Sequence, residues 1–358
     1  MRKIFSGLIL LISVNSVAQD STRSNQVQFS AYIDVYYNYD FNKPVNNDRP
    51  AFFYSHNRHN EFNLNLGFLK GSYNTDRVRA NLALAAGTYM NANYAAETGL
   101  LKNIYEANAG VKISKKKNLW VDAGIFASHI GFESAASKDC QTLTRSILAD
   151  NSPYFESGAK ITYSSKNEKW IISALLLNGW QRIKRVAGNS AMSYGTQLQY
   201  KPNSKMLMNY STFFGTDKPD TARQWRCFHN FYGIFNVTHK FGITAGFDVG
   251  AEQNAKRSSD MSTWYAPVLI LRYAINGKWA VAVRGEYYSD RNEVIITSGT
   301  SNGFQTSVFS FNLDYAPVNN ALIRLEARTL KSKDNIFVKG NGFTDNNNFI
   351  TSSIAVNF

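Results

Sequence analysis

The sequence has little cysteine and proline, and it has no apolar run long enough to cross a membrane as a helix. Its 358 residues include two cysteines, seven prolines and five histidines. So few cysteines exclude a disulfide-rich scaffold, although a single bridge between Cys140 and Cys227 stays open in an oxidising compartment. The histidines are scattered without metal-ligand spacing, so we expect neither a metal nor another cofactor. Ser128 and His129 are neighbours and would point to opposite sides of a strand, so we expect no catalytic pair and no enzymatic activity.

The only long apolar stretch lies at the N-terminus. A transmembrane helix needs about 20 apolar residues, whereas residues 4–14 form a shorter run. Arg2 and Lys3 precede this run, and the small residues of a cleavage site, ending at Ala18, follow it. This order is typical of a secretory signal peptide. We expect cleavage after Ala18, which removes Arg2 and Lys3 and leaves residues 19–358 as a single domain.

What the chain has instead is a two-residue alternation of apolar and polar side chains. In residues 27–39 the apolar positions are Val27, Phe29, Ala31, Ile33, Val35, Tyr37 and Tyr39. Successive side chains of a strand point to opposite faces, so this stretch predicts a strand with one apolar and one polar face. About sixteen such stretches follow one another, a pattern typical of transmembrane β-barrels. We predict an all-β fold, an antiparallel up-and-down barrel of about 16 strands; in its second strand Phe62, Leu64, Leu66 and Phe68 should face lipid.

The breaks between these stretches alternate in length. Short polar turns, such as Asn276-Gly277, alternate with longer polar segments, such as residues 42–56. Outer-membrane barrels have short periplasmic turns and longer extracellular loops, so both chain ends should lie on the periplasmic side. The last strand ends at Phe358, and a terminal aromatic residue after an alternating strand is expected to serve as an assembly signal for the barrel-insertion machinery.

The longest break, His129–Ser152, follows the fifth predicted strand. It carries the charged residues Glu133, Lys138, Asp139, Arg145 and Asp150. A sixteen-stranded barrel leaves a wide aqueous channel, and a channel that discriminates between solutes needs an internal obstruction. We therefore predict that this loop folds into the lumen and constricts the pore, with a solvated external loop as the alternative.

Charged side chains also occupy inward positions of the predicted strands. Arg77 and Arg79 share one face, and Arg324 and Arg328 flank Glu326 on another; Arg284 is inward as well. These arginines either orient solutes in the pore or form ion pairs that brace the wall. Most of the remaining positive charge lies in turns and loops, where contact with lipopolysaccharide phosphate is expected and nucleic-acid binding is not.

One motif resembles a known family. The stretch from Gly124 to Glu133 (GIFASHIGFE), followed by Pro153 and Gly158, resembles the Gly…Ile-Gly-Tyr-Glu…Pro…Gly pattern of the OmpL-like family of β-barrel porins. Phe132 stands where that family more often has tyrosine. The first predicted strand is also similar to the family's opening strand. The resemblance extends over essentially the whole mature chain and implies an outer-membrane porin, without identifying a solute.

Three functions agree with these features. The first is an outer-membrane porin for passive diffusion of small hydrophilic solutes. The second is a channel specific for sugars or oligosaccharides, with an aromatic slide formed by Tyr32, Tyr36, Tyr89 and Tyr288. The third is a non-conducting barrel that acts through its surface loops as an adhesin or enzyme. Outer-membrane lipid is an expected partner, and a homotrimer is suggested by fold analogy alone.

Overall fold

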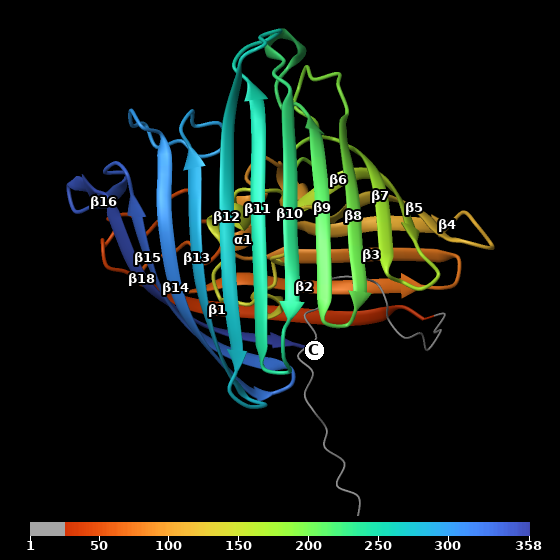
Figure 1. The fold of residues 1–358 in the computed structure, drawn as a ribbon, viewed down its shortest axis with the longest axis horizontal. Coiled ribbons are helices and arrows are strands. Elements are labelled where there is room, and N and C mark those ends of the chain that lie inside the picture. Colours follow the sequence, from red (N-terminus) through yellow and green to blue (C-terminus); the bar gives the residue numbers. More distant parts are fainter. Residues whose placement is uncertain (1–25) are drawn as a thin grey trace, which may run out of the picture.

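The chain forms a closed antiparallel β-barrel, which a computed structural model describes for residues 26–358 (Figure 1). The predicted signal peptide, residues 1–18, lies outside the described residues. Sixteen strands close the barrel, as predicted, because β1 pairs with both β2 and β18. The strands are β1 (Gln28–Asp40), β2 (Phe62–Asn74), β3 (Val78–Ala86), β4 (Ile104–Lys112), β5 (Asn118–Ala127), β6 (Phe155–Ser164), β7 (Trp170–Leu177), β8 (Ser193–Asn203), β9 (Met206–Gly215), β10 (Arg226–Asn236), β11 (Phe241–Gln253), β12 (Met261–Ala274), β13 (Trp279–Asp290), β14 (Phe304–Val318), β15 (Ala321–Ser332) and β18 (Asn346–Asn357), with a separate hairpin of β16 (Phe337–Lys339) and β17 (Gly342–Thr344).

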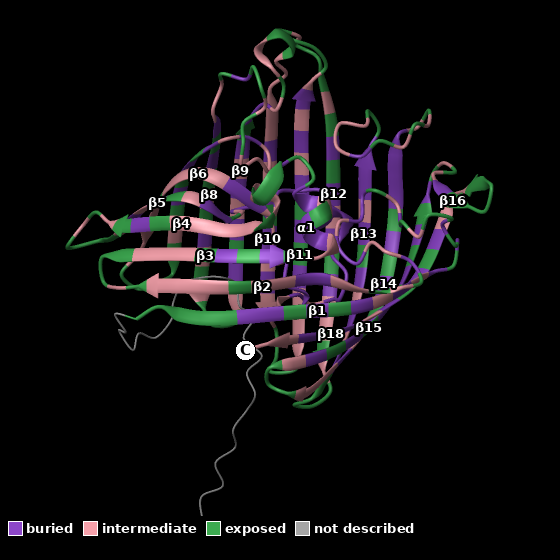
Figure 2. Cartoon of the chain, turned by 180° about the vertical axis from the view of Figure 1, so that it is seen from behind, coloured by how far each residue is buried: buried purple, intermediate pink, exposed green. Residues whose placement is uncertain are grey.

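Burial alternates along the strands, as the sequence pattern requires (Figure 2). In β15 the outward Ile323 and Leu325 are 41% and 47% exposed, whereas Arg324 and Glu326, on the other face, are buried. An apolar outer face against lipid and a polar inner face are what a membrane-spanning barrel needs. In Figure 1 the strands of the near wall, β8–β12, cross those of the far wall, β1–β4, which reflects the tilt of barrel strands.

The connections alternate between short and long. The short turns include residues 75–77 and 319–320, and on the same side Phe358 pairs with Ala31 through two backbone hydrogen bonds. Three of the long connections matter for the interior, and we name them L1 (residues 41–61), L2 (87–103) and L3 (128–154). The described helices all lie in connections, namely α1 (Thr88–Asn93), η1 (Gly99–Asn103), η2 (Ser137–Asp139), α2 (Ile147–Asp150) and η3 (Asp220–Ala222). None of these helices is long and apolar enough to cross a membrane.

The predicted orientation of β2 is wrong for two residues. A β-bulge between Asp34 and Val35 shifts the pairing of β1 with β2, and an extra residue changes which face the following side chains occupy. Leu66 is therefore fully buried inside the barrel, and the Phe68 ring stacks on Tyr32 with centroids 5.4 Å apart. Leu69, 70% exposed, faces outward instead.

Apolar side chains gather inside the barrel. One cluster joins Phe52 and Phe53 of L1 and Ile147 and Leu148 of L3 to inward residues of the wall, such as Trp264. A second cluster joins residues of α1 to Leu66 and other wall residues. Connections from the long-loop side therefore pack within the barrel and bury part of its inner face.

Candidate functional site

The first part of L3 is held against β6, β9 and β10. His129 faces Glu156 Oε2 with its Nδ1 and the Thr212 carbonyl oxygen with its Nε2, both at 2.8 Å. Burial lowers the pKa of His129, but the Glu156 carboxylate outweighs it and raises the pKa above its ordinary value. Two acceptors at the two ring nitrogens suit the imidazolium, which donates from both. The Gly131 N–H donates to Asn230 Oδ1 at 3.1 Å, with Gly131 at a φ of 85° that favours glycine.

The second part of L3 is held by backbone hydrogen bonds to side chains of the opposite wall. The Leu143 N–H donates to Asn312 Oδ1 at 2.9 Å. The Thr144 N–H and hydroxyl donate to Glu326 Oε2 at 2.6 and 2.8 Å. The Ile147 N–H donates to Glu286 Oε2 at 2.6 Å. L3 therefore contacts inward side chains of β13, β14 and β15 as well as those of β6, β9 and β10.

Three inward arginines donate to carbonyl oxygens of L3. Arg284 reaches the Thr144 oxygen at 2.6 Å, and Arg328 reaches the Arg145 oxygen at 2.8 Å. Arg324 reaches the oxygens of Ser137, Cys140 and Thr142 at 2.5, 3.2 and 3.2 Å. Carboxylates of the wall accept other N–H groups of these arginines: Glu326 accepts from Arg284, Glu286 from Arg328 and Asp314 from Arg324.

These carboxylates and arginines form one buried charge network. Arg284 lies 3.0 Å from Glu326 and 3.1 Å from Glu286, and it lies 3.7 Å from Glu133 of L3. Arg328 lies 2.6 Å from Glu286. All these side chains are almost completely buried. Removal of one partner from such a network would leave an uncompensated buried charge, which is strongly destabilising.

Two charged residues of L3 hold the loop in its own shape. Arg145 donates to the carbonyl oxygens of Ser134 and Ala135 at 2.6 Å each and to that of Leu143 at 2.7 Å. Glu133 accepts the Ser146 N–H at 2.9 Å and also the Ser146 hydroxyl. The glutamate of the Ile-Gly-Phe-Glu motif thus ties the start of L3 to the N-terminus of α2.

The remaining predicted lumen residues lie apart from this network. Lys138 and Asp139 are half-buried in η2, where the Lys138 N–H donates to the Tyr32 hydroxyl at 3.4 Å. Arg79 pairs with Asp122 of β5 through two hydrogen bonds of 2.6 and 2.5 Å. Arg77 is exposed in the turn before β3. Arg77 and Arg79 do not face L3, because they lie at the short-turn end of the barrel whereas L3 enters from the other end.

L1 also enters the barrel, which its sequence did not lead us to expect. Phe53 packs edge-on against Phe349 of β18, and the Arg49 guanidinium lies 4.1 and 3.6 Å from the centroids of these two rings. His56, fully buried, lies 3.2 Å from Asp34 of β1. The apolar group Phe52-Phe53-Tyr54 inside an otherwise polar connection is the signal that could have predicted this packing.

The four tyrosines of the predicted aromatic slide are all buried. Tyr32, Tyr36, Tyr89 and Tyr288 are at most 3% exposed, so they do not line a path open to water. Instead they pack within the barrel, as when Tyr288 packs edge-on against Phe304. Part of the interior of the long-loop half is therefore filled by buried side chains of the wall and of the connections.

In the short-turn half, several charged side chains on the inner face stay partly exposed. Lys70 of β2 forms an ion pair of 2.7 Å with Glu106 of β4, and both are partly open to solvent. Arg79, Lys112 and Lys160 are likewise partly exposed. Charged side chains in this part of the lumen are therefore within reach of water.

The two cysteines are not bridged. Cys140 is buried in L3, where its thiol lies 3.3 Å from the Ser134 carbonyl oxygen. Cys227 pairs in register with the outward-facing Phe214, which places it on the outer face of β10. A barrel wall therefore separates the two thiols. Within residues 26–358, no group of three or more histidine, cysteine or acidic side chains is placed to hold a metal ion.

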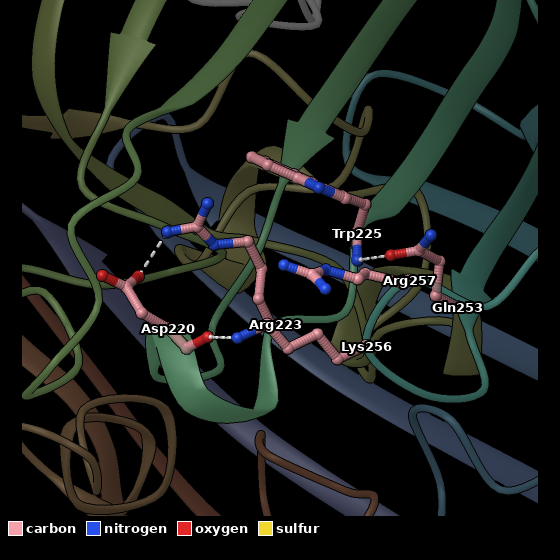
Figure 3. Close-up of a pocket in the computed structure, with 6 residues that line it drawn as sticks. All are labelled: Asp220, Arg223, Trp225, Gln253, Lys256 and Arg257. Carbon is pink, nitrogen blue, oxygen red and sulfur yellow. Dashed lines mark hydrogen bonds and ion pairs between the residues drawn. The ribbon is translucent and has the colours of Figure 1, made fainter.

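A surface cavity of about 380 Å³ lies between the connections that follow β9 and β11. Figure 3 shows the Arg223 guanidinium directed at the Asp220 carboxylate, the Arg257 side chain near the Trp225 ring, and Lys256 bonded to the Asp220 carbonyl oxygen. The Asp220 carboxylate accepts hydrogen bonds from the Ser190 N–H, at 3.0 Å, and from Arg223, and these two bonds hold its pKa well below the ordinary range. The Trp225 ring stacks on the outward Phe214 with centroids 4.9 Å apart, so the cavity opens on the outer side of the barrel rim.

Comparisons with known proteins agree with this architecture. The family model described as "Putative beta-barrel porin-2, OmpL-like" matches residues 26–358. Among solved structures, the chain is similar to an anion-selective porin from Comamonas acidovorans, with 10% identity, 93% of this chain and 99% of that chain covered, and a TM-score of 0.61. It is also similar to Salmonella typhi OmpF in complex with daunomycin, with 8% identity, 93% of this chain and 98% of that chain covered, and a TM-score of 0.61. A third similar structure is the trimer form of Vibrio cholerae OmpT, with 9% identity, 93% of this chain and 99% of that chain covered, and a TM-score of 0.59. No match was found among curated protein sequences. Identities this low show a shared fold, whereas the family match extends over the whole described chain; the protein belongs to the OmpL-like family of outer-membrane β-barrel porins.

Proposed function

We propose that the protein is a porin through which small hydrophilic solutes diffuse passively, and that L3 constricts its lumen. The observation that carries this proposal is the set of hydrogen bonds that ties L3 to inward side chains of β6, β9 and β10 on one side and of β13, β14 and β15 on the other. A loop held on both sides of a barrel narrows any path past it, so solute size is the first property on which such a channel discriminates.

In this proposal the arginines of β13 and β15 brace L3 and do not touch solute. Arg284, Arg324 and Arg328 are at most 3% exposed, and they donate to carbonyl oxygens of the loop. Of the two roles left open by the sequence, bracing agrees better with this burial. Lys138 and Asp139, half-buried at the surface of L3, are the better candidates for charges that face the path.

A non-conducting barrel remains the second candidate, because L1, L2 and L3 bury so much of the long-loop half. The specific sugar channel has less support, since the tyrosines of its aromatic slide are buried. Conductance separates the two remaining candidates directly.

The same proposal places the protein in the outer membrane, exported by the leader at residues 1–18. Phe358, which is 68% exposed beside the β1–β18 closure, would present the assembly signal to the insertion machinery. The cations around Trp225 suit contact with lipopolysaccharide phosphates at the outer rim. A homotrimer follows by analogy with the trimer form of Vibrio cholerae OmpT.

The test is to shorten L3 between Ser134 and Ala149 and to record single-channel conductance in planar bilayers. We expect higher conductance and entry of larger sugars in liposome-swelling assays. Shortening the exposed connection at residues 254–260 is the matched control and should change neither. An unchanged conductance and size cutoff after the L3 deletion would place the constriction in the barrel wall, and a parent protein without conductance would favour the non-conducting barrel.

A further inference from the structure

The charge of the protein is unevenly divided between the two ends of the barrel. The short turns and the strand residues next to them carry ten basic residues and two acidic ones, Asp76 and Glu168. The basic residues are Arg77, Lys115, Lys116, Lys117, Lys166, Lys169, Lys201, Lys205, Lys240 and Lys278. The short-turn end thus has a net charge of +8, out of +13 for the whole chain. The eight long connections together carry only +4, although they contain far more residues.

The basic residues surround the periplasmic mouth. All ten are exposed, and they occupy six of the seven short turns, so they are spread around the barrel and not gathered on one side. A ring of like charges around a low-dielectric wall produces a potential that attracts ions of the opposite sign to the opening. We call these ten residues the basic rim.

The exposed charge on the inner wall next to the basic rim is also mostly positive. The partly exposed inward side chains of the short-turn half include five basic residues, Lys70, Arg79, Lys112, Lys160 and Arg272. Glu106 is the one acidic side chain among the described inward strand positions there that is not buried. Asp122 and Asp314, the carboxylates beside Arg79 and Arg272, are themselves buried. Charge that solutes can reach is therefore mostly positive from the mouth to the middle of the lumen.

We propose that the channel selects small anionic solutes, and that the basic rim and the five inward cations set this preference at the periplasmic end. Rings of charged side chains select ions in pores by their sign. The network around L3 contributes little to the preference, because its arginines are buried and solutes do not reach them. This inference rests on the proposed function, since it needs a conducting pore.

The two sets of cations should differ in their response to salt. Exposed charges are screened over about 10 Å at 0.1 M salt and about 3 Å at 1 M. The basic rim should therefore act mainly at low ionic strength. The inward cations line the path itself, so their effect should persist in 1 M salt.

The test is the reversal potential of the purified full-length channel in a planar bilayer under a KCl gradient. The parent should be anion-selective at 0.1 M. The double variant Lys116→Gln/Lys117→Gln should lower the ratio of chloride to potassium permeability by about twofold at 0.1 M and much less at 1 M, from the screened Coulomb interaction of two rim charges. Lys112→Gln/Lys160→Gln should lower the ratio at both salt concentrations.

The matched control is Lys184→Gln/Lys339→Gln, which removes two exposed lysines from the extracellular connections. It should leave the permeability ratio unchanged. A parent channel that is unselective or prefers cations would overturn the inference but leave the porin function intact. An anion-selective parent whose ratio is unchanged in both periplasmic variants would also overturn it. A parent without any conductance would overturn the porin function and this inference together.

Discussion

Arg324 offers the sharpest test of the way L3 is held. Its guanidinium forms a bidentate pair with Asp314, at 2.8 and 3.1 Å, and donates to three carbonyl oxygens of L3. Hydrogen bonds from a charged donor each contribute about 1.5–3 kcal/mol. In an Arg324→Gln variant a neutral amide replaces at most one of them, while Arg284 and Arg328 still hold the loop. We expect a net loss of about 3 kcal/mol for the inserted loop, which is roughly a hundredfold shift toward its released form.

Single-channel recording measures this shift as the fraction of time spent at higher conductance. Arg79→Gln is the matched control, because Arg79 makes the same kind of bidentate pair with Asp122 but none of the described hydrogen bonds to L3. Arg79→Gln should change ion selectivity and leave the open fraction as it is. If both variants open equally often, or neither does, then Arg324 does not hold the loop.

Three further predictions concern the membrane face, assembly and pH. Leu82→Arg on the outer face of β3, where Leu82 is 56% exposed, should lower the free energy of unfolding in lipid by about 2–4 kcal/mol. The inward substitution Asn81→Arg should change this free energy little. If a urea titration finds Asn81→Arg the more destabilising of the two, the assigned register is wrong. Deletion of Phe358 should reduce the amount of heat-modifiable barrel in the outer membrane without reducing export, and normal levels would make Phe358 ordinary strand filling. Burial raises the pKa of Asp150 in α2 to about 7, against the opposing charges of nearby arginines. Because the buried site favours the neutral carboxyl, Asp150 stabilises the inserted loop at low pH, and this stabilisation is lost as the pH rises through about 7. Openings should therefore be more frequent at pH 8 than at pH 5. Asp150→Asn should abolish the difference.

Most of the wall could be predicted from the sequence, because the alternation of apolar and polar residues within each strand shows which side chains face lipid and which face the lumen. In β15 the alternation of Ile323 and Leu325 with Arg324 and Glu326 is enough to assign both faces. The rule fails where the backbone adds a residue without a local signal. The bulge opposite Asp34 turned Leu66 and Phe68 inward, and nothing in the composition of β2 marks it.

The interior could not be predicted in the same way, because its contacts join residues far apart in the chain. Thr144 and Glu326 meet across the barrel only after closure has brought β15 opposite the connection from β5. The motif from Gly124 to Glu133 located L3 but not its partners. L1 was overlooked because its polar ends suggest a solvated loop, while Phe52 and Phe53 near its middle supply the apolar surface that packs inside.

These two limits together explain why inward charges alone do not predict pore chemistry. An inward arginine next to a loop becomes buried, and burial is tolerated only with a carboxylate and several acceptors around it, as Arg324 has with Asp314 and L3. Such a charge stabilises structure and is hidden from solute. An inward lysine with no loop beside it, such as Lys112, keeps its charge available to the water path. The sign of the charge that solutes meet in the lumen is then set by the side chains that the loops leave uncovered. In this barrel those side chains lie toward the short-turn end and are mostly positive.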